Sequence, residues 1–308
     1  MAGESADVAH RFRVLLSTYN GARFLSDQID SVLEQRDARV ELHIRDDGST
    51  DDTVTLLRTR AHADARVTYD CGERLGAARS YLTMLSETPD DVDYVALCDQ
   101  DDVWINGKLV RAASWLSDLD GPAMYCSAVE VVDEDLHPLG VHRTCRRGPA
   151  LANALVQNIA TGCTIVMNPK ALHLFRQVPD HPVMHDSWIY AATVAAGTVV
   201  YDPSTWVRYR QHDANSIGLA PSPLEQWWRR LGQHVASGNR RVHTVQAAEL
   251  LQLLNDEITP DARSILTAFV RSQTSVTGRI RYAVAGPAFR QRRIDSIVYR
   301  VLFALGRI

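Results

Sequence analysis

Three carboxylates stand within four residues of the chain, Asp99, Asp101 and Asp102, directly after a short apolar segment at 94–97. Carboxylates this close repel one another and resist the loss of water unless a cation lies among them. Mg²⁺ and Mn²⁺ prefer such oxygen ligands and commonly share them with the phosphates of a substrate. The cluster therefore predicts a metal–diphosphate site, and the alternative interpretation is an acidic turn in solvent.

The elements that must position these carboxylates alternate between strand and helix patterns. We expect buried strands at 12–17, 40–44, 67–69 and 94–97, and helices at 25–33, from a capping box at 49–52 onward, and at 75–85. This order predicts an α/β fold, a parallel sheet with helices on both faces. Ligands of such sheets bind beyond the carboxyl ends of the strands, so Tyr19, Asp47 and the carboxylates from Asp99 to Asp102 should converge at one edge.

The second half of the chain is less regular. Its patterns predict strands at 124–127, 129–132, 162–168, 198–201 and 206–211, and a helix at 187–196 that Asp186 precedes. Helices are expected at 224–235, 243–254 and 261–273, after the proline-rich start of a new segment. We therefore predict one domain over 1–220, with halves at about 11–104 and 105–220, and a C-terminal helical region over 221–308.

Composition narrows the class of protein. A net charge of −4 gives no reason to expect nucleic acid as a partner. Five cysteines without CxxC spacing favour reduced thiols in a cytoplasmic protein and disfavour a zinc site. No apolar run approaches the ~18 residues of a membrane-spanning helix, and the N-terminal residues lack the apolar core of a signal peptide.

The last thirty residues have a charge pattern of their own. From Arg279 onward there are seven arginines and one acid, Asp295, a local net charge of +6, interleaved with apolar residues. Such a basic amphipathic end can lie on an anionic membrane surface, here the inner face of the cell membrane. The alternative is a helix that docks on the domain with its arginines in water.

Several motifs stand in an order that resembles family 2 glycosyltransferases, in particular bacterial rhamnosyltransferase-like members. They are STYNG at 17–21, DDGSTD at 46–51, CDQDDVW at 98–104, TGCT at 161–164, HD at 185–186, YRQH at 209–212 and NSIG at 215–218. The resemblance covers about 11–220. It implies a GT-A fold, a Rossmann-like nucleotide-binding domain fused to an acceptor-binding half around a mixed, mainly parallel sheet, with the C-terminal helices as an extension.

The resemblance also implies an activity. It is the inverting, metal-dependent transfer of a sugar from a dTDP- or UDP-linked donor to a saccharide or lipid-linked saccharide acceptor, in the synthesis of a cell-surface polysaccharide or glycoconjugate. The cofactor would be Mg²⁺ or Mn²⁺. The resemblance to rhamnosyltransferase-like members in particular implies L-rhamnose as the sugar. Two other classes stay open: a non-catalytic nucleotide-sugar binding protein, and a nucleotidyltransferase, which would need a glycine-rich basic loop near the first strand that STYNG does not provide.

Residue roles carried over from the family concern the nucleotide and the metal. Asp47 matches the position that hydrogen-bonds the pyrimidine base, where a carboxylate suits the donor-only N3–H. The expected nucleotide-binding residues are Ser17, Tyr19, Asp47, Gly76, Arg79 and Asp99. The expected metal ligands are Asp101, favoured as the direct ligand, His212, and Asp102, which could substitute for either neighbouring aspartate.

On the acceptor side, Asp186 matches the catalytic base that takes the proton of the acceptor hydroxyl. The family often has Glu-Asp at this point and this chain has His185-Asp186, which leaves open whether the histidine orients the base. The expected lining of the sugar pocket is Trp104, Gly162, Cys163 and Trp188. Core packing is an equal alternative for the two tryptophans. Relatives tend to carry Asn-x-Gly-x-x-x-Asn after the third strand, whereas both asparagine positions differ in RLGAARS at 74–80.

Overall fold

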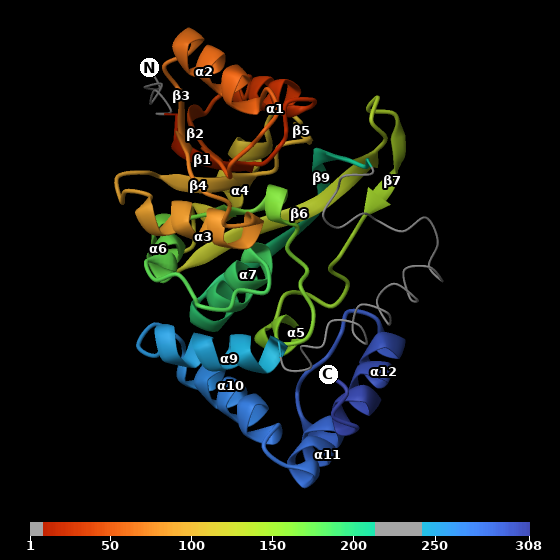
Figure 1. The fold of residues 1–308 in the computed structure, drawn as a ribbon. Helices are drawn as coiled ribbons and strands as arrows, with labels where there is room; N and C mark the ends of the chain where they lie inside the picture. Colours follow the sequence, from red (N-terminus) through yellow and green to blue (C-terminus); the bar gives the residue numbers. More distant parts are fainter. Residues whose placement is uncertain (1–8, 213–241) are drawn as a thin grey trace, which may run out of the picture.

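A computed structural model describes residues 9–212 and 242–308. The helix expected at 224–235, the domain boundary near 220 and the motif at 215–218 lie outside the described residues. Within those residues the chain has the α/β architecture that the strand and helix patterns predicted (Figure 1). The division into 1–220 and 221–308 stays a proposal.

The first half forms the parallel part of the sheet. Strands β1 (Arg11–Thr18), β2 (Arg39–Asp46), β3 (Val67–Cys71) and β4 (Tyr94–Cys98) pair in the order β3-β2-β1-β4. Leu16 of β1 is paired with Ile44 of β2 on one side and with Cys98 of β4 on the other. The three strands therefore end at the same level, and the polar residues that follow each of them meet at one edge of the sheet.

The second half continues the same sheet with mixed directions. Its strands are β8 (Val166–Met167), β6 (Ala123–Val132), β9 (Thr198–Arg210), β5 (Val103–Trp104) and, beside β6, β7 (Pro138–His142). β6 pairs parallel with β9 and antiparallel with β8 and β7, and β9 pairs antiparallel with β5. The sheet is mixed, as the family resemblance implied.

Two pairs of strands expected from the sequence are single strands. β6 covers both 124–127 and 129–132, and β9 covers both 198–201 and 206–210. The apparent break in β9 is a bulge, because the register with β6 shifts between Ser127, which faces Asp202, and Ala128, which faces Thr205. Pro203 cannot donate to a strand ladder, which explains why the shift occurs there. The expected strand at 162–168 is a 3₁₀ turn, Gly162–Thr164, followed by the short β8.

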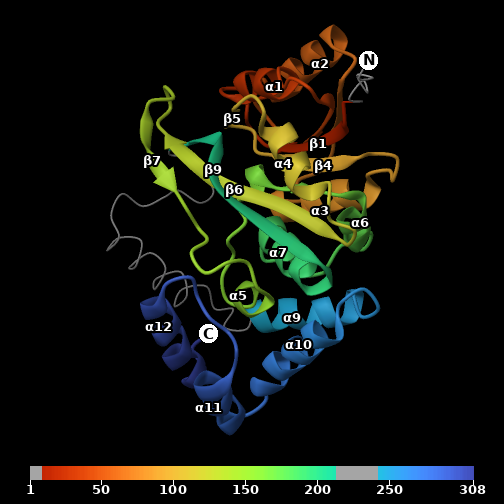
Figure 2. The ribbon, with the colours of Figure 1, turned by 180° about the vertical axis from the view of Figure 1, so that it is seen from behind.

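Helices cover both faces of the sheet (Figures 1 and 2). On one face, α1 (Leu25–Leu33), α2 (Thr53–Ala63) and α4 (Lys108–Leu116) bury Ile29, Leu57 and Leu109 in one core. On the other face, α3 (Ala77–Glu87), α6 (Pro169–Leu172) and α7 (His185–Ala196) form a second core together with α5 (Leu151–Ala154) and the 3₁₀ turn His173–Phe175.

The capping box expected at 49–52 does not form. Asp52 is the N-cap of α2, but its side chain makes no capping bond. The Asp51 carboxylate instead accepts from the backbone N–H of Thr53 at 3.1 Å and from its hydroxyl at 2.5 Å. Ser49 is drawn away from the helix because its hydroxyl accepts from the N–H of Asn20.

Four helices make up the described C-terminal part, which forms the lower end of the molecule in Figure 1. They are α9 (Val242–Leu253), α10 (Pro260–Ser272), α11 (Val276–Ala285) and α12 (Arg293–Ala304). α9 and α10 match the helices expected at 243–254 and 261–273. Leu250, Leu266 and Phe303 belong to the same core as α3 and α7, so these helices pack directly on the α/β part.

Candidate active site

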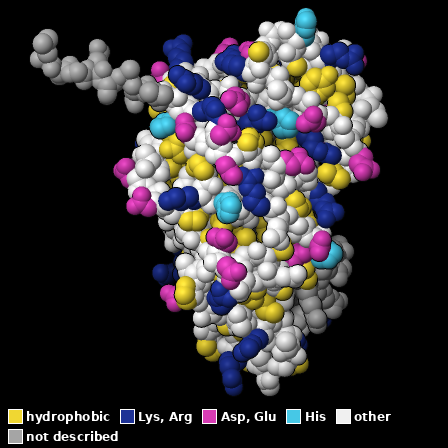
Figure 3. All heavy atoms as spheres, turned by 90° about the vertical axis from the view of Figure 1, so that its left-hand side faces the viewer, with side chains coloured by type: hydrophobic (Ala, Val, Ile, Leu, Met, Phe, Trp, Pro, Cys, Tyr) yellow, Lys and Arg dark blue, Asp and Glu magenta, His cyan; other side chains and the backbone are white. Residues whose placement is uncertain are grey.

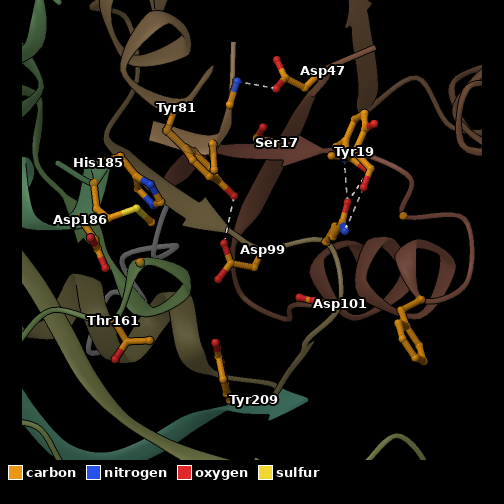
Figure 4. A pocket seen from close by; sticks show the side chains of 18 of the residues that line it. Ser17, Tyr19, Asp47, Tyr81, Asp99, Asp101, Thr161, His185, Asp186 and Tyr209 are labelled. Atoms are coloured by element: carbon orange, nitrogen blue, oxygen red, sulfur yellow. Dashed lines mark hydrogen bonds between the residues drawn. The ribbon is translucent and has the colours of Figure 1, made fainter. Parts of the chain in front are cut away.

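One large cavity, of about 820 Å³, lies beyond the carboxyl ends of β1, β2 and β4. Residues of both halves of the chain line it (Figure 4). The residues singled out from the sequence that line it are Ser17, Tyr19, Asp47, Gly76, Asp99, Asp101, Gly162, Asp186 and His212. Segments nearly 200 residues apart in the chain thus meet in one space large enough for a nucleotide sugar.

Asp47 organises the wall of the cavity that follows β2. Its carboxylate accepts from the backbone N–H groups of Leu75, at 2.8 Å, and Gly76, at 2.7 Å, and pairs with Arg45. Burial opposes the charge of Asp47, but these bonds outweigh burial and lower the pKa of its carboxyl. Gly76 has φ +78°, a conformation that favours glycine, and the loop can therefore turn its N–H toward the carboxylate.

Tyr19 lies beside Asp47 in Figure 4. The guanidinium of Arg74 lies over its ring, 4.1 Å from the centroid. The side-chain oxygen of Gln100 accepts from the N–H of Tyr19, at 2.9 Å, and from the hydroxyl of Thr18, at 2.7 Å. These bonds tie the end of β1 to the acidic loop after β4, so the two loops are held together as one surface.

Asp99 lies at the centre of the cavity in Figure 4, and the hydroxyl of Tyr81 points toward it. That hydroxyl is 2.6 Å from the carbonyl oxygen of Cys98 and 3.1 Å from the Asp99 carboxylate. Burial and the neighbouring carboxylates of Asp101 and Asp186 raise the pKa of Asp99 to about 7. Carboxylates that raise one another's pKa in this way are a favourable place for a cation.

Asp101 and His212 form the second part of the acidic site. Nε2 of His212 lies 2.8 Å from a carboxylate oxygen of Asp101, although the two residues are 111 positions apart. The His212 ring also packs beside Phe24, with ring centroids 5.0 Å apart. Carboxylate oxygens and an imidazole nitrogen facing one cavity are a donor set that suits Mn²⁺ and, less well, Mg²⁺.

Asp186 and His185 begin α7 and face Asp99 from the other half of the chain (Figure 4). Burial raises the pKa of Asp186 to about 6, although hydrogen bonds from the Ser187 N–H and the Asn158 amide oppose the rise. A carboxylate with this pKa is ionised at neutral pH and has a higher proton affinity than an exposed aspartate, a combination suited to a general base.

His185 is held as a neutral ring. It is 4% exposed and stacks on Tyr81 with ring centroids 4.1 Å apart. Neither of its ring nitrogens has a hydrogen-bond partner among the described residues, and burial lowers its pKa to about 3. A Cβ added at Gly162 would lie 2.7 Å from Nε2 of His185. The absence of a side chain at Gly162 therefore leaves space for the His185 ring beside the cavity.

Three residues expected in the site lie behind it or beside it. Arg79 is exposed on α3 and does not line the cavity. Asp102 is fully buried, accepts from the N–H of Arg210 at 3.1 Å, and comes within 4.8 Å of the ligand atoms of Asp99 and Cys163. Burial, followed by the charges of Asp101 and Asp99, raises the pKa of Asp102 well above its usual range, and burial raises the pKa of the Cys163 thiol in the same direction. Neither side chain lines the cavity.

The two tryptophans are packing residues in the structure. Trp188, a residue of α7, is buried in the core on one face of the sheet. Trp104 is buried in the core on the opposite face. Neither lines the cavity. The ammonium of Lys108 lies 3.5 Å from the centroid of the Trp104 ring, where burial lowers the pKa of the lysine to about 8. The expectation that both rings face the sugar gives way to the alternative of core packing, because large apolar rings close the core behind the loops.

The sequence patterns missed several residues that line the cavity. Tyr81 stands in none of the motifs, and Arg74 and Gln100 stand in RLGAARS and CDQDDVW without an expected role. All three line the cavity and contact predicted site residues. Tyr81 lies within the helix expected at 75–85, which says nothing of the polar partner that a buried tyrosine hydroxyl needs. Gln100 stands between two of the aspartates, and only the fold shows that it bonds to the end of β1.

Comparison with known proteins shows the family and the fold. The family model described as Glycosyl transferase family 2 matches residues 13–173. The dTDP-rhamnosyl transferase RfbG of Shigella flexneri is 23% identical over 231 residues, 70% of this chain and 78% of that protein. A crystal structure of S. aureus TarS with UDP-GlcNAc superposes with TM-score 0.59 at 13% identity, over 97% of this chain and 81% of that one.

A further solved structure superposes on the chain, the mannosyltransferase PcManGT from Pyrobaculum calidifontis in complex with GDP-Man and Mn²⁺. Its TM-score is 0.51 at 18% identity, over 96% of this chain and 87% of that one. At these identities, TarS and PcManGT show a shared fold.

Proposed function

The chain belongs to glycosyl transferase family 2, and on that premise we propose that it is a metal-dependent, inverting enzyme that transfers L-rhamnose from a dTDP-linked donor to a saccharide. Glycosyltransferase activity follows from the family; the sugar, the metal and the roles of single residues are the proposal. The observation that carries it is that Asp47, Asp101 and Asp186, from three distant segments, line one cavity.

The nucleoside would lie between Asp47 and Tyr19. An ionised carboxylate has about four acceptor sites, and the two backbone N–H groups and Arg45 occupy three of those of Asp47. One acceptor site remains for the N3–H of thymine or uracil. Tyr19 offers a ring face in the same wall, with Arg74 already stacked on it.

Asp101 and His212, with Asp99 beside them, would hold the divalent cation. The cation supplies positive charge for the departing diphosphate. The raised pKa of Asp99 supports this donor set. Burial and repulsion from nearby carboxylates destabilise the ionised form of Asp99, and a bound cation would offset both effects. The Mn²⁺ complex of PcManGT adds support at the level of the fold.

Asp186 would act as the base. The acceptor hydroxyl oxygen forms a bond to the anomeric carbon while the bond from that carbon to the diphosphate oxygen breaks, and the electron pair leaves with the diphosphate. Asp186 takes the hydroxyl proton. The neutral ring of His185, with one N–H donor and one acceptor nitrogen, would orient a substrate hydroxyl beside it.

The rhamnosyl donor is supported by one relative, RfbG, described as a dTDP-rhamnosyl transferase. The acceptor is proposed as a saccharide or lipid-linked saccharide of a cell-surface polymer. The enzyme would act at the inner, cytoplasmic side of the membrane, where nucleotide sugars are made.

Nucleotide-dependent thermal shifts test the binding part of the proposal. We expect dTDP with Mn²⁺ to raise the melting temperature most, since a ligand at a hundredfold its Kd stabilises by about 2.7 kcal/mol. UDP and GDP are the matched comparisons. In Asp101→Asn, the increment due to Mn²⁺ should disappear. No shift with any of these nucleotides, with or without metal, would contradict the assignment of the cavity.

Transfer assays test the reaction itself. The enzyme is incubated with a panel of nucleotide sugars and simple saccharide acceptors, with Mn²⁺ or with EDTA, and the released nucleoside diphosphate is measured. We expect turnover with dTDP-rhamnose that EDTA abolishes and a product of inverted anomeric configuration. Nucleotide binding without turnover of any donor would favour a non-catalytic binding protein.

A further inference from the structure

The outward side of the last two helices carries an unusual concentration of apolar groups. Among the described residues, more than half of the exposed large hydrophobic side chains lie on α11, α12 or the residue directly after α12. They are Val276, Ile280, Val284, Ile294, Ile297, Val301 and Leu305, each between 49% and 75% exposed. Scattered exposed hydrophobic residues are ordinary, but a set gathered on one supersecondary unit indicates a surface with a partner.

The spacing of these residues places them in two stripes. On α11 they recur every four residues, and on α12 and its end they are three, four and four residues apart, so each helix presents one continuous apolar line. The opposite sides of the same helices are buried, with Tyr282 and Phe303 packed at a ring-centroid distance of 5.4 Å.

The two stripes share one side of the helix pair because the helices run antiparallel. Arg300, midway along α12, donates to the carbonyl oxygens of Ala283 and Val284 near the end of α11, both at 3.1 Å. A Cβ at Gly306 would lie 3.2 Å from the guanidinium of Arg279 near the start of α11. In an antiparallel pair, the positions one residue after the contact positions turn to the same side of both helices.

The segment that carries this apolar face is strongly basic. Residues 276–308 contain seven arginines and one acid, a net charge of +6. Four of the arginines, at 281, 292, 293 and 307, are exposed, and none of these four has a carboxylate partner among the described residues. Figure 3 shows Lys and Arg side chains beside hydrophobic ones at the lower end of the molecule, where α11 lies. Long arginine side chains at the edge of an apolar stripe can reach outward to phosphate groups.

We propose that the α11–α12 face, defined by the seven apolar residues above and the arginines at 281, 292, 293 and 307, docks on an anionic phospholipid surface. The charge is complementary to such a surface, and aliphatic side chains of this size insert between lipid headgroups. The face exposes Val, Ile and Leu but no Tyr or Trp, two of the residue types that contribute most to binding at protein–protein interfaces. No helix in the described ranges is long and apolar enough to span a bilayer, so the contact is peripheral.

The segment 144–158 connects this face to the cavity. Gln291, just before α12, accepts from the N–H groups of Arg146 and Arg147, at 2.8 and 2.7 Å. Its own N–H donates to Gln157 at 2.8 Å. Thr144 and Asn158, at the two ends of this segment, line the cavity. Binding of the α11–α12 face to a membrane would therefore hold this wall of the cavity close to the bilayer. The proposed membrane contact does not depend on the proposed reaction.

Vesicle co-sedimentation of the full chain tests the proposal without any turnover. Vesicles contain phosphatidylcholine alone or with a third phosphatidylglycerol. We expect binding to the anionic vesicles that falls as salt rises. The triple variant Ile297→Ser, Val301→Ser, Leu305→Ser should bind at least about tenfold more weakly. Replacing the arginines at 292, 293 and 307 by glutamine should weaken binding roughly fivefold for each charge removed.

A matched control removes as many exposed apolar groups elsewhere, with Val110→Ser, Trp115→Ser and Leu139→Ser. It should bind the anionic vesicles like the wild type. Circular dichroism of each variant checks that it is folded. Wild-type binding to neither vesicle, or equal binding of the serine triple variant and the wild type, would overturn the proposal. So would a wild-type dimer in sedimentation velocity that the serine variant dissociates, because the face would then be an interface between two copies.

Discussion

Gly162→Ala is the substitution that tests the packing of the candidate site most directly. The added Cβ would lie 2.7 Å from Nε2 and 3.5 Å from Cε1 of His185, and 3.7 Å from the Cβ of Asp186. A carbon at 2.7 Å from a ring nitrogen is well inside van der Waals contact. The ring has little freedom to move away, because it is 4% exposed and stacked on Tyr81. The substitution must therefore displace either the ring or the turn at 162–164.

The magnitude follows from overpacking a buried site, which costs about 1–3 kcal/mol. At about 2–4 °C for each kcal/mol in a large domain, the melting temperature should fall by about 2–12 °C. The displaced ring borders the cavity next to Asp186. We therefore also expect kcat/KM to fall, while the melting-temperature shift produced by the nucleotide alone stays close to that of the wild type.

A double-mutant cycle with His185→Ala separates steric conflict from other causes. If the ring is what the new methyl group meets, the double variant should be more stable than the sum of the single changes predicts, by at least about 1 kcal/mol. Gly121→Ala is the matched control, since a Cβ there meets nothing within 4 Å. Additive effects in urea unfolding, or a Gly162→Ala protein that melts with the wild type, would refute the reasoning.

Three further predictions follow from the site and the fold. Because the pKa of Asp186 is raised to about 6 and the base must be ionised, kcat/KM should rise with pH through about 6 and then level off; Asp186→Asn should lose about 10²–10⁴ in rate together with this rise, and an unchanged rate would remove the base assignment. Asp47→Ala leaves Arg45, whose side chain is 11% exposed, without its carboxylate partner and should lower the free energy of unfolding by about 3 kcal/mol at pH 7. The pKa of Asp47 is lower in the folded than in the unfolded chain. The stability that Asp47 contributes is therefore present above the ordinary aspartate pKa and is lost as pH falls through the folded-state pKa. A difference in unfolding free energy between wild type and Asp47→Ala that does not shrink in acid would contradict this account. Gly197→Ala places a Cβ 1.9 Å from the backbone oxygen of Pro122, which cannot rotate away, and should destabilise by more than about 3 kcal/mol in urea unfolding; a near-neutral effect would mean that the β6–β9 end is looser than the structure shows.

Much of the cavity wall that follows β1, β2 and β4 could be predicted from the sequence, because it follows from local rules. The strands at 12–17, 40–44 and 94–97 are short apolar runs that end in turn residues, and parallel strands bring their carboxyl ends together. The pattern of parallel strands therefore places Asp47 and Asp99 at one edge of the sheet, and both line the cavity.

The five expected residues that do not line the cavity show where this reasoning stops. Asp101 and Asp102 are adjacent in the chain, yet one faces the cavity and the other is buried against the backbone of Arg210. Tryptophan rings can line a sugar pocket, but Trp104 and Trp188 are both buried in the core. Residue type and spacing do not state which way a side chain turns, because that depends on partners supplied from elsewhere in the chain.

By itself, the sequence determined the family, the α/β alternation, and the presence of separated acidic motifs, since these depend on residue type, period and order along the chain. Only the tertiary structure decided that His212 meets Asp101 across 111 positions, that His185 is stacked neutral on Tyr81, and that the apolar stripes of α11 and α12 share one side. The physical reason is that burial, pairing and the facing of helices arise from contacts between distant segments, and these contacts exist only once the chain has folded.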